Sequence, residues 1–178
     1  MPANGKNLLE SFKSISHFIF DIDGVLTDGQ VLVFESGEQV RRMSIKDGFA
    51  LQLAVKKNYR IAVVSGGNGL GAKNRLLKLG ITDIFLQISD KKNWMEEYLQ
   101  GNKLEWKNIL YMGDDIPDCA VMAMAGMPCA PADAVPEVLR LAKYISPFAG
   151  GGGCVRDVIE KVLRLRGDWD LGTPIASR

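Results

Sequence analysis

The stretch HFIFDIDGVLTDG, residues 17–29, leads an apolar run directly into two aspartates, Asp21 and Asp23. The run Phe18–Ile22 has the length and composition of a buried β-strand. Since side chains alternate along a strand, residues two apart point the same way, and both carboxylates project from one strand end. Two carboxylates so close repel one another and need a cation or a shared proton. The stretch therefore predicts a strand with an ionic site at its carboxyl end.

Two other structures compete for this motif. A calcium-binding EF-hand loop also begins with Asp-x-Asp-Gly, but it needs an oxygen ligand at position five, glycine at six and glutamate at twelve. Here those positions hold Val25, Leu26 and Leu32, which excludes the EF-hand. The other alternative is a solvated loop in which the two aspartates occur by chance. The residues at the ends of the other expected strands help to decide between this loop and an ionic site.

Short apolar runs alternate with amphipathic stretches along the rest of the chain. This alternation predicts an α/β fold, a three-layer Rossmann-like arrangement with a parallel sheet between two layers of helices. One segment, 30–45, breaks the pattern and reads as two strands around a Glu-Ser-Gly-Glu turn, which predicts a β-hairpin after the first strand. The expected strands are Phe18–Ile22, Arg60–Ser65, Asp83–Leu86, Ile109–Gly113, Met127–Ala130 and Tyr144–Ile145; the expected helices are Phe49–Lys57, Ala72–Leu79, Lys92–Gln100, Pro117–Ala125, Val135–Leu141 and Val155–Leu165.

The length of 178 residues suits a single domain, 1–178, with the hairpin at 30–45 and an irregular tail at 167–178. A formal net charge of +1 gives no basic field for nucleic acid, and no apolar run is long enough to span a membrane. Three cysteines without a CxxC spacing argue against zinc and against a disulfide framework, and favour a reducing cytoplasm. The one histidine, His17, begins an apolar strand and is interpreted as structural. Chemistry must therefore come from carboxylates, lysine, serine and the backbone.

Polar residues also follow the other expected strands. Each alone is typical of a turn, a solvated charge or a helix cap. Because ligands of parallel sheets lie beyond the carboxyl ends of the strands, these residues are expected to converge on one rim. They are Ser65 with Gly66 and Gly67, Lys91, and Asp114, Asp115 and Asp118.

This set of side chains suits phosphoryl transfer. A carboxylate can attack phosphorus to form an aspartyl phosphate. Mg²⁺ takes hard oxygen ligands, often one or two carboxylates, and offsets the repulsion between those carboxylates and an incoming phosphate. Lys91 and the Ser65 hydroxyl can hold the non-bridging oxygens, where charge develops.

Taken in order, Asp-x-Asp, Ser, Lys and Gly-Asp-Asp resemble the motifs of the haloacid dehalogenase superfamily of phosphotransferases, over about Phe18 to Ile159. The resemblance implies that Asp21 is the nucleophile and that Asp23 is the general acid and base. For Asp115 and Asp118 two roles stay open, orienting Lys91 or orienting metal-bound water. The implied ligand sets are Asp21, the backbone carbonyl of Asp23 and Asp114 for Mg²⁺, and Ser65, Gly66 and Lys91 for the phosphoryl group.

The two aspartates can have separate roles because their environments differ. Asp21, bound to metal, stays ionised and can attack, whereas Asp23 can carry a proton to the leaving alkoxide. A bacterial receiver domain also places carboxylates, a hydroxyl and a lysine around Mg²⁺. Its acidic pair lies on the first strand, however, whereas here the pair Asp114–Asp115 comes late, which argues against a receiver domain.

No cap domain fits between the motifs. The chain between Asp23 and Ser65 has room for the hairpin and one helix, and that between Ser65 and Lys91 for one helix and one strand. An uncovered site is open to water, which weakens its electrostatics. Either a large substrate or a neighbouring subunit must then cover the site.

The second option, cover by a neighbouring subunit, fits a closer resemblance. The chain is similar to the capless tetrameric phosphatases of 3-deoxy-D-manno-octulosonate 8-phosphate, because its segments DIDGVLTDGQ, IKDGFAL, LGITDIF, YMGDDIPD and GGGGCVRD match the motifs of that family in order. The resemblance implies a homotetramer with active sites at subunit interfaces, helped by the hairpin, that hydrolyses a sugar-acid phosphate. The alternative is a hairpin packed only on its own domain. Lys46 and Arg156 are the candidate cations for the acidic sugar, and Asp47 is the candidate partner of its hydroxyls. Each of these three can instead be a surface charge or a helix cap.

Two departures from that family concern the substrate. The second motif usually continues with arginine or lysine, where this chain has Gly67, and the late glycine loop usually contains a polar residue, whereas Gly150–Gly153 is unbroken. A nine-carbon sugar-acid 9-phosphate therefore stays open as the substrate. So does a non-catalytic oligomeric partner protein with the same fold.

Overall fold

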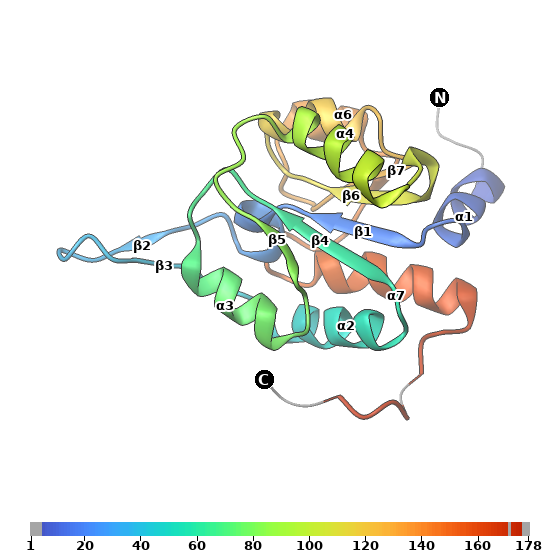
Figure 1. The fold of residues 1–178 in the computed structure, drawn as a ribbon, viewed down its shortest axis with the longest axis horizontal. Helices are drawn as coiled ribbons and strands as arrows, with labels where there is room; N and C mark the ends of the chain where they lie inside the picture. The colour runs from blue at the N-terminus through green and yellow to red at the C-terminus, as the bar shows by residue number, and fades with distance from the viewer. Residues whose placement is uncertain (1–4, 171, 176–178) are drawn as a thin grey trace.

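The computed structural model describes residues 5–170 and 172–175. Its centre is a six-stranded sheet in the order β5-β4-β1-β6-β7-β8, in which every neighbouring pair is parallel (Figure 1). Every expected strand is present, and four of the six are shorter by one residue. The strands are β1 (His17–Phe20), β4 (Arg60–Val64), β5 (Asp83–Phe85), β6 (Ile109–Met112), β7 (Met127–Ala130) and β8 (Tyr144–Ile145).

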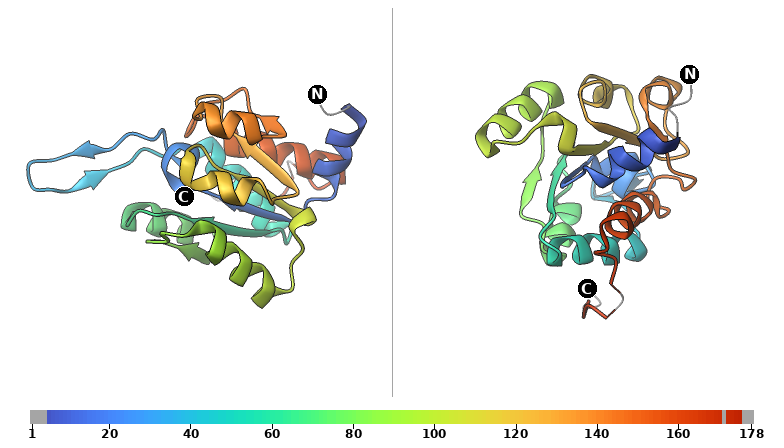
Figure 2. Two further views of the ribbon diagram at one scale, coloured as in Figure 1. Left: turned by 90° about the horizontal axis from the view of Figure 1, so that it is seen from above. Right: turned by 90° about the vertical axis from the view of Figure 1, so that its right-hand side faces the viewer.

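Helices cover both faces of this sheet, which confirms the three-layer α/β arrangement (Figures 1 and 2). The alternation along β1 explains the two layers of core: Phe18 and Phe20 pack with α1, α2, α3 and α7, whereas Ile19 packs with α4, α5 and α6. The helices are α1 (Gly5–Lys13), α2 (Ile45–Lys56), α3 (Leu70–Lys78), α4 (Lys91–Asn102), α5 (Cys119–Met122), α6 (Pro136–Leu141) and α7 (Cys154–Arg166). None of the helices in the described part of the chain has the length and apolar character needed to cross a membrane.

The structure differs from the sequence-based expectations most clearly at three helices. The sequence did not predict α1. Helix α2 begins four residues before the expected Phe49, because the Ser44 side chain accepts a hydrogen bond from the Asp47 backbone N–H (3.2 Å) and caps it there. The helix expected over 117–125 is largely absent: a 3₁₀ turn at Ile116–Asp118 precedes the short α5, because Asp115 and Asp118 cap one another's backbone.

The hairpin projects from the body of the molecule beyond the carboxyl ends of the strands (Figures 1 and 2). β2 (Leu32–Val33) and β3 (Gln39–Val40) pair antiparallel, with Leu32 opposite Val40. All ten residues from 31 to 40 are exposed. The tail contains no helix or strand at 167–170 and 172–175, and the rest of the expected irregular segment lies outside the described residues.

Candidate active site

The residues expected at the sheet rim do converge. The carboxyl ends of β4, β1 and β6, three adjacent strands, open into a cavity of about 350 Å³. Asp21 follows β1, Ser65 follows β4, and Asp114 follows β6 by two residues. The predicted site residues that line this cavity are Asp21, Asp23, Ser65, Gly66, Lys91, Asp114, Asp115 and Asp118.

Lys91 forms the centre of a buried ionic network. It is the first residue of α4, and its Nζ lies 2.9 Å from Asp21 Oδ2 and 2.8 Å from Asp118 Oδ1. Burial alone would lower the pKa of Lys91, but the two carboxylates raise that pKa above its ordinary value. Lys91 is therefore a fixed ammonium group beside Asp21.

Asp118 holds this ammonium group in place. The side chain is fully buried and accepts hydrogen bonds from the Tyr111 hydroxyl at Oδ1 (2.5 Å) and from the Asp114 backbone N–H at Oδ2 (3.1 Å). Of the two roles left open for Asp118, orienting Lys91 is the one its contacts favour. Tyr111 was not foreseen, because a tyrosine inside an apolar strand resembles any other core residue.

Asp21, Asp114 and Asp118 form an acidic cluster in which one oxygen of each lies within 4.8 Å of the others. Burial first, and then the charge of Asp118, raises the pKa of Asp21 to about 7; burial and then Asp21 raise the pKa of Asp114 to about 7. Asp114 Oδ1 is buried and has no hydrogen-bond partner among the described residues. An acceptor without a donor in a cluster of carboxylates fits a hard cation such as Mg²⁺.

Gly24 makes room for this cluster. Its φ is +82°, and a Cβ atom at this position would lie 1.9 Å from Asp114 Oδ2. The glycine of the Asp-x-Asp-Gly motif therefore allows the first and fourth motifs to approach one another closely.

Asp23 lies outside the acidic cluster. Its carboxylate is bound by Arg41, which follows β3 of the hairpin, with Nε 2.6 Å from Asp23 Oδ1. The sequence analysis missed Arg41, because no motif marks it and the contact joins segments 18 positions apart.

Ser65 lies at the end of β4 and is 3% exposed. Its backbone N–H donates to the Phe85 carbonyl (2.9 Å), and its Oγ accepts a hydrogen bond from the Gly67 N–H (3.0 Å). The side chain is thus fixed at the cavity wall beside Gly66.

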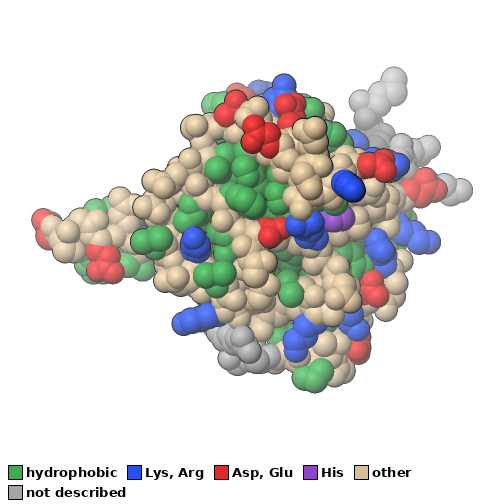
Figure 3. Space-filling model, viewed as in Figure 1, with side chains coloured by type: hydrophobic (Ala, Val, Ile, Leu, Met, Phe, Trp, Pro, Cys, Tyr) green, Lys and Arg blue, Asp and Glu red, His purple; other side chains and the backbone are tan. Residues whose placement is uncertain are grey.

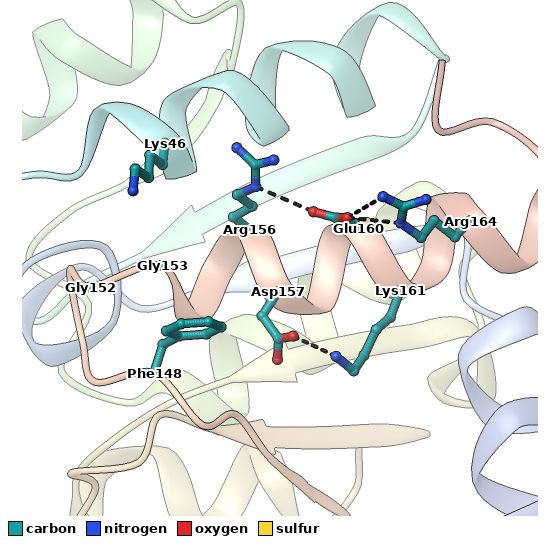
Figure 4. A pocket seen from close by; sticks show the side chains of 9 residues that line it. All are labelled: Lys46, Phe148, Gly152, Gly153, Arg156, Asp157, Glu160, Lys161 and Arg164. Atoms are coloured by element: carbon teal, nitrogen blue, oxygen red, sulfur yellow. Dashed lines mark hydrogen bonds and ion pairs between the residues drawn. The ribbon is translucent and has the colours of Figure 1, made fainter. Parts of the chain in front are cut away.

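The three candidate substrate contacts do not line this cavity. Lys46 and Arg156 line a separate pocket of about 550 Å³ along α7, where Arg156 pairs with Glu160 at 3.3 Å (Figure 4). Asp47 is 1% exposed, and its Oδ1 accepts a hydrogen bond from the Arg156 backbone N–H (2.7 Å) at the start of α7. Burial raises the pKa of Asp47. Within one chain, these residues and Asp21 therefore belong to different sites.

The unbroken glycine run lies between the two sites. A Cβ atom at Gly150 would lie 2.0 Å from the Gly24 carbonyl oxygen, and the Gly151 N–H donates to the Val25 carbonyl (2.9 Å). The run therefore packs its backbone directly against the first motif, which explains the glycine at position 150.

Comparisons with known proteins place these motifs in a family. The chain is 30% identical over 164 residues to 3-deoxy-D-manno-octulosonate 8-phosphate phosphatase KdsC of Escherichia coli K12, covering 92% of this chain and 87% of that protein. No protein-family model matches the chain.

Solved structures of proteins with the same or related names are also similar to this chain. The phosphatase of that name from Yersinia pestis superposes with a TM-score of 0.88 at 30% identity, covering 91% of this chain and 88% of that one. The Moraxella catarrhalis phosphatase, solved in complex with magnesium, phosphate and KDO, gives 0.90 at 26% identity, covering 94% and 96%. A Legionella pneumophila structure described as a putative HAD superfamily (subfamily III A) hydrolase gives 0.89 at 29% identity, covering 92% and 90%.

Proposed function

The chain belongs to the 3-deoxy-D-manno-octulosonate 8-phosphate phosphatase family of the haloacid dehalogenase superfamily, and from this premise we propose that it is a Mg²⁺-dependent phosphatase of that sugar-acid phosphate. The relatives' names supply the substrate. The observation that carries the activity is the convergence of Asp21, Lys91 and Asp114 on one cavity at the carboxyl end of the sheet.

Asp21 and Asp114, with the backbone carbonyl of Asp23, are the proposed ligands of Mg²⁺. The unpartnered Asp114 Oδ1 and the raised pKa values of Asp21 and Asp114 support this choice, because a cation offsets the repulsion within the cluster. Asp118 is not included, because each of its oxygens already accepts two hydrogen bonds, from Lys91 and Tyr111 at Oδ1 and from two backbone N–H groups at Oδ2. When bound, Mg²⁺ supplies positive charge that stabilises the phosphate in the transition state.

Asp21 is the proposed nucleophile. Its carboxylate oxygen attacks phosphorus, the ester P–O bond breaks, and Asp23 gives a proton to the departing alcohol oxygen. Water then attacks the aspartyl phosphate while Asp23 takes a proton from it, and inorganic phosphate leaves. Lys91, Ser65 and the Gly66 backbone hold the non-bridging oxygens during both steps.

A homotetramer with shared active sites is the proposed assembly. Apolar side chains are exposed along the hairpin, where Leu32 and Val33 are 61% and 62% exposed, and they lie beside the acidic tip in Figure 3. An apolar surface of this kind is typical of a contact with another subunit. Lys46 and Arg156 would then bind the sugar acid at a neighbouring subunit's cavity, and Asp47 would hold Arg156 in place through the start of α7.

We also propose a cytoplasmic location. The three cysteines, Cys119, Cys129 and Cys154, are free thiols, as is typical of a reducing compartment.

A phosphate-release assay tests the function. The substrates are 3-deoxy-D-manno-octulosonate 8-phosphate, the nine-carbon 2-keto-3-deoxynononate 9-phosphate, and a neutral sugar phosphate. We expect the eight-carbon ester to be preferred, activity to require Mg²⁺ and be lost with EDTA, and Asp21→Asn to be inactive. Preference for the nine-carbon ester would correct the substrate. No phosphate release from any of the three would favour a non-catalytic partner protein.

A further inference from the structure

Arg41 reaches from the hairpin to the active site. Its guanidinium contacts both oxygens of Asp23, with Nε 2.6 Å from Oδ1 and Nη2 3.5 Å from Oδ2. The Arg41 side chain is 15% exposed, whereas that of its neighbour Arg42 is 85% exposed and pairs with Asp28. Of two adjacent arginines, one therefore turns toward the site and the other stays in solvent.

Glycine at position 67 leaves room for this arrangement. A Cβ atom there would lie 3.3 Å from Asp23 Oδ2, 3.5 Å from Ser65 Oγ and 3.9 Å from Arg41 Nη2. A long side chain at position 67 would start in the space that the guanidinium borders. The arginine or lysine that the resembled family usually has at position 67 is glycine in this chain, and Arg41 brings a positive charge to the same place from the hairpin.

The charge balance of the cavity supports a role for Arg41. Among the described residues that line the cavity, five are aspartates and Lys91 is the one basic side chain. Lys91 is already bonded to Asp21 and Asp118. Among the residues that the structure describes, no lysine pairs with Asp23. A planar guanidinium that contacts both carboxylate oxygens fixes the orientation of the carboxylate plane.

We propose that Arg41 is a positioning residue for Asp23, which it holds by a two-point contact so that Asp23 meets the oxygen of the leaving alcohol. This inference rests on the proposed function, in which the electron pair of the breaking P–O bond passes to that oxygen and the proton comes from Asp23. The hairpin then contributes directly to the chemistry of the site.

Dependence on the leaving group separates this role from a merely structural one. The sugar alkoxide needs a proton in order to leave, whereas p-nitrophenolate does not. We expect Arg41→Ala and Arg41→Gln to lower kcat/KM, which reports formation of the aspartyl phosphate but not its hydrolysis, about tenfold or more for 3-deoxy-D-manno-octulosonate 8-phosphate, and by less than about threefold for p-nitrophenyl phosphate. Arg41→Lys, which keeps the charge without the planar fork, should recover part of the loss.

Two controls complete the experiment. Arg42→Ala, the matched surface variant, should leave kcat/KM for both substrates unchanged. Adding Arg41→Ala to Asp23→Asn should cause no further loss for the sugar-acid phosphate, because Arg41 acts through Asp23.

Equal losses with both substrates, or losses that add to those of Asp23→Asn, would overturn the positioning role while leaving the phosphatase activity intact. If the parent protein released no phosphate from either compound, the proposed function and this inference would both fall.

Discussion

Two aspartates four positions apart, Asp114 and Asp118, have different roles because their hydrogen-bond partners differ. Asp118 accepts hydrogen bonds from Lys91 Nζ, from the Tyr111 hydroxyl and from backbone N–H groups. Asp114 Oδ1, which is buried as well, accepts none among the described residues. At the scale of single residues, Asp118 therefore orients a cation of the protein, and Asp114 has an oxygen left for a cation from solution.

Replacing Asp118 with asparagine tests this division. The change removes one of two carboxylates from the buried Lys91, and we expect the free energy of unfolding to fall by about 3 kcal/mol. Mg²⁺ should still raise the Tm of Asp118→Asn, because the proposed ligands stay in place. Urea unfolding and thermal melts with and without Mg²⁺ measure both effects. If Mg²⁺ raised the Tm of Asp114→Asn but not that of Asp118→Asn, the metal ligand would be Asp118 rather than Asp114.

Gly24 offers a second prediction at this scale. Gly24→Ala places a methyl group 1.9 Å from Asp114 Oδ2 at a φ of +82°, and we expect a loss of about 3 kcal/mol or more in the free energy of unfolding and weaker Mg²⁺ binding. Gly37→Ala is the matched control, because its φ is +84° but nothing lies within 4 Å of the added Cβ. The control should cost only about 1 kcal/mol. Similar losses for both variants, measured by urea unfolding, would show that backbone strain alone matters.

At the scale of elements, the hairpin is the segment whose structure its own domain explains least. β2 and β3 each have two residues, and their apolar side chains lie in solvent rather than in either core cluster. Isolated two-stranded hairpins are at best marginally stable in water. A contact with another subunit would supply the burial that the hairpin lacks.

The double variant Leu32→Ser, Val33→Ser should therefore dissociate the proposed tetramer. Both side chains are exposed in the single chain, so the fold of the subunit should stay intact. Light scattering after gel filtration gives the mass, and circular dichroism checks the fold. Leu9→Ser is the control, because Leu9 is 55% exposed on α1, at the other end of the molecule from the hairpin (Figure 1). A parent protein that elutes as a monomer would contradict the assembly.

The sequence predicts the strands well because parallel strands buried on both faces form unbroken apolar runs with polar residues at one end. Asp21, Ser65, Lys91 and Asp114 follow from that rule. Arg41 could not be predicted in the same way, since its role depends on how the hairpin folds back onto Asp23. Local capping decides elements that differ, such as α2, which begins four residues early because the Ser44 side chain caps it.

At the scale of the whole molecule, the glycine run separates two ionic regions of opposite character. The sheet rim holds five aspartates around Lys91. The pocket along α7 holds the four basic side chains Lys46, Arg156, Lys161 and Arg164 with the two acidic residues Asp157 and Glu160 (Figure 4). Under the proposed function, the second region would attract the anionic substrate and the first would hydrolyse it. Assembly of several subunits is the proposed way to bring the two together.

The acidic rim also makes the stability of the molecule depend on pH and Mg²⁺ together. Burial and mutual repulsion raise the pKa values of Asp21 and Asp114 from 3.8 to about 7. Without metal, their contribution to stability is therefore fully present below about pH 4 and is lost as the pH rises through 7. Mg²⁺ binds the ionised carboxylates, so its stabilising effect should grow over the same interval.

Thermal melts at pH 5.5, 6.5, 7.5 and 8.5, in EDTA and in Mg²⁺, measure this coupling. At pH 8.5 and about 100-fold above the Kd, Mg²⁺ should stabilise the fold by about 2.7 kcal/mol, which raises the Tm by about 5 to 11 °C. At pH 5.5 the increase should be small, because protons compete for the same oxygens. Asp21→Asn combined with Asp114→Asn removes both titrating groups and should abolish the response to Mg²⁺ at every pH. An equal Mg²⁺-induced rise in the parent Tm at pH 5.5 and 8.5 would place the ion at some other site.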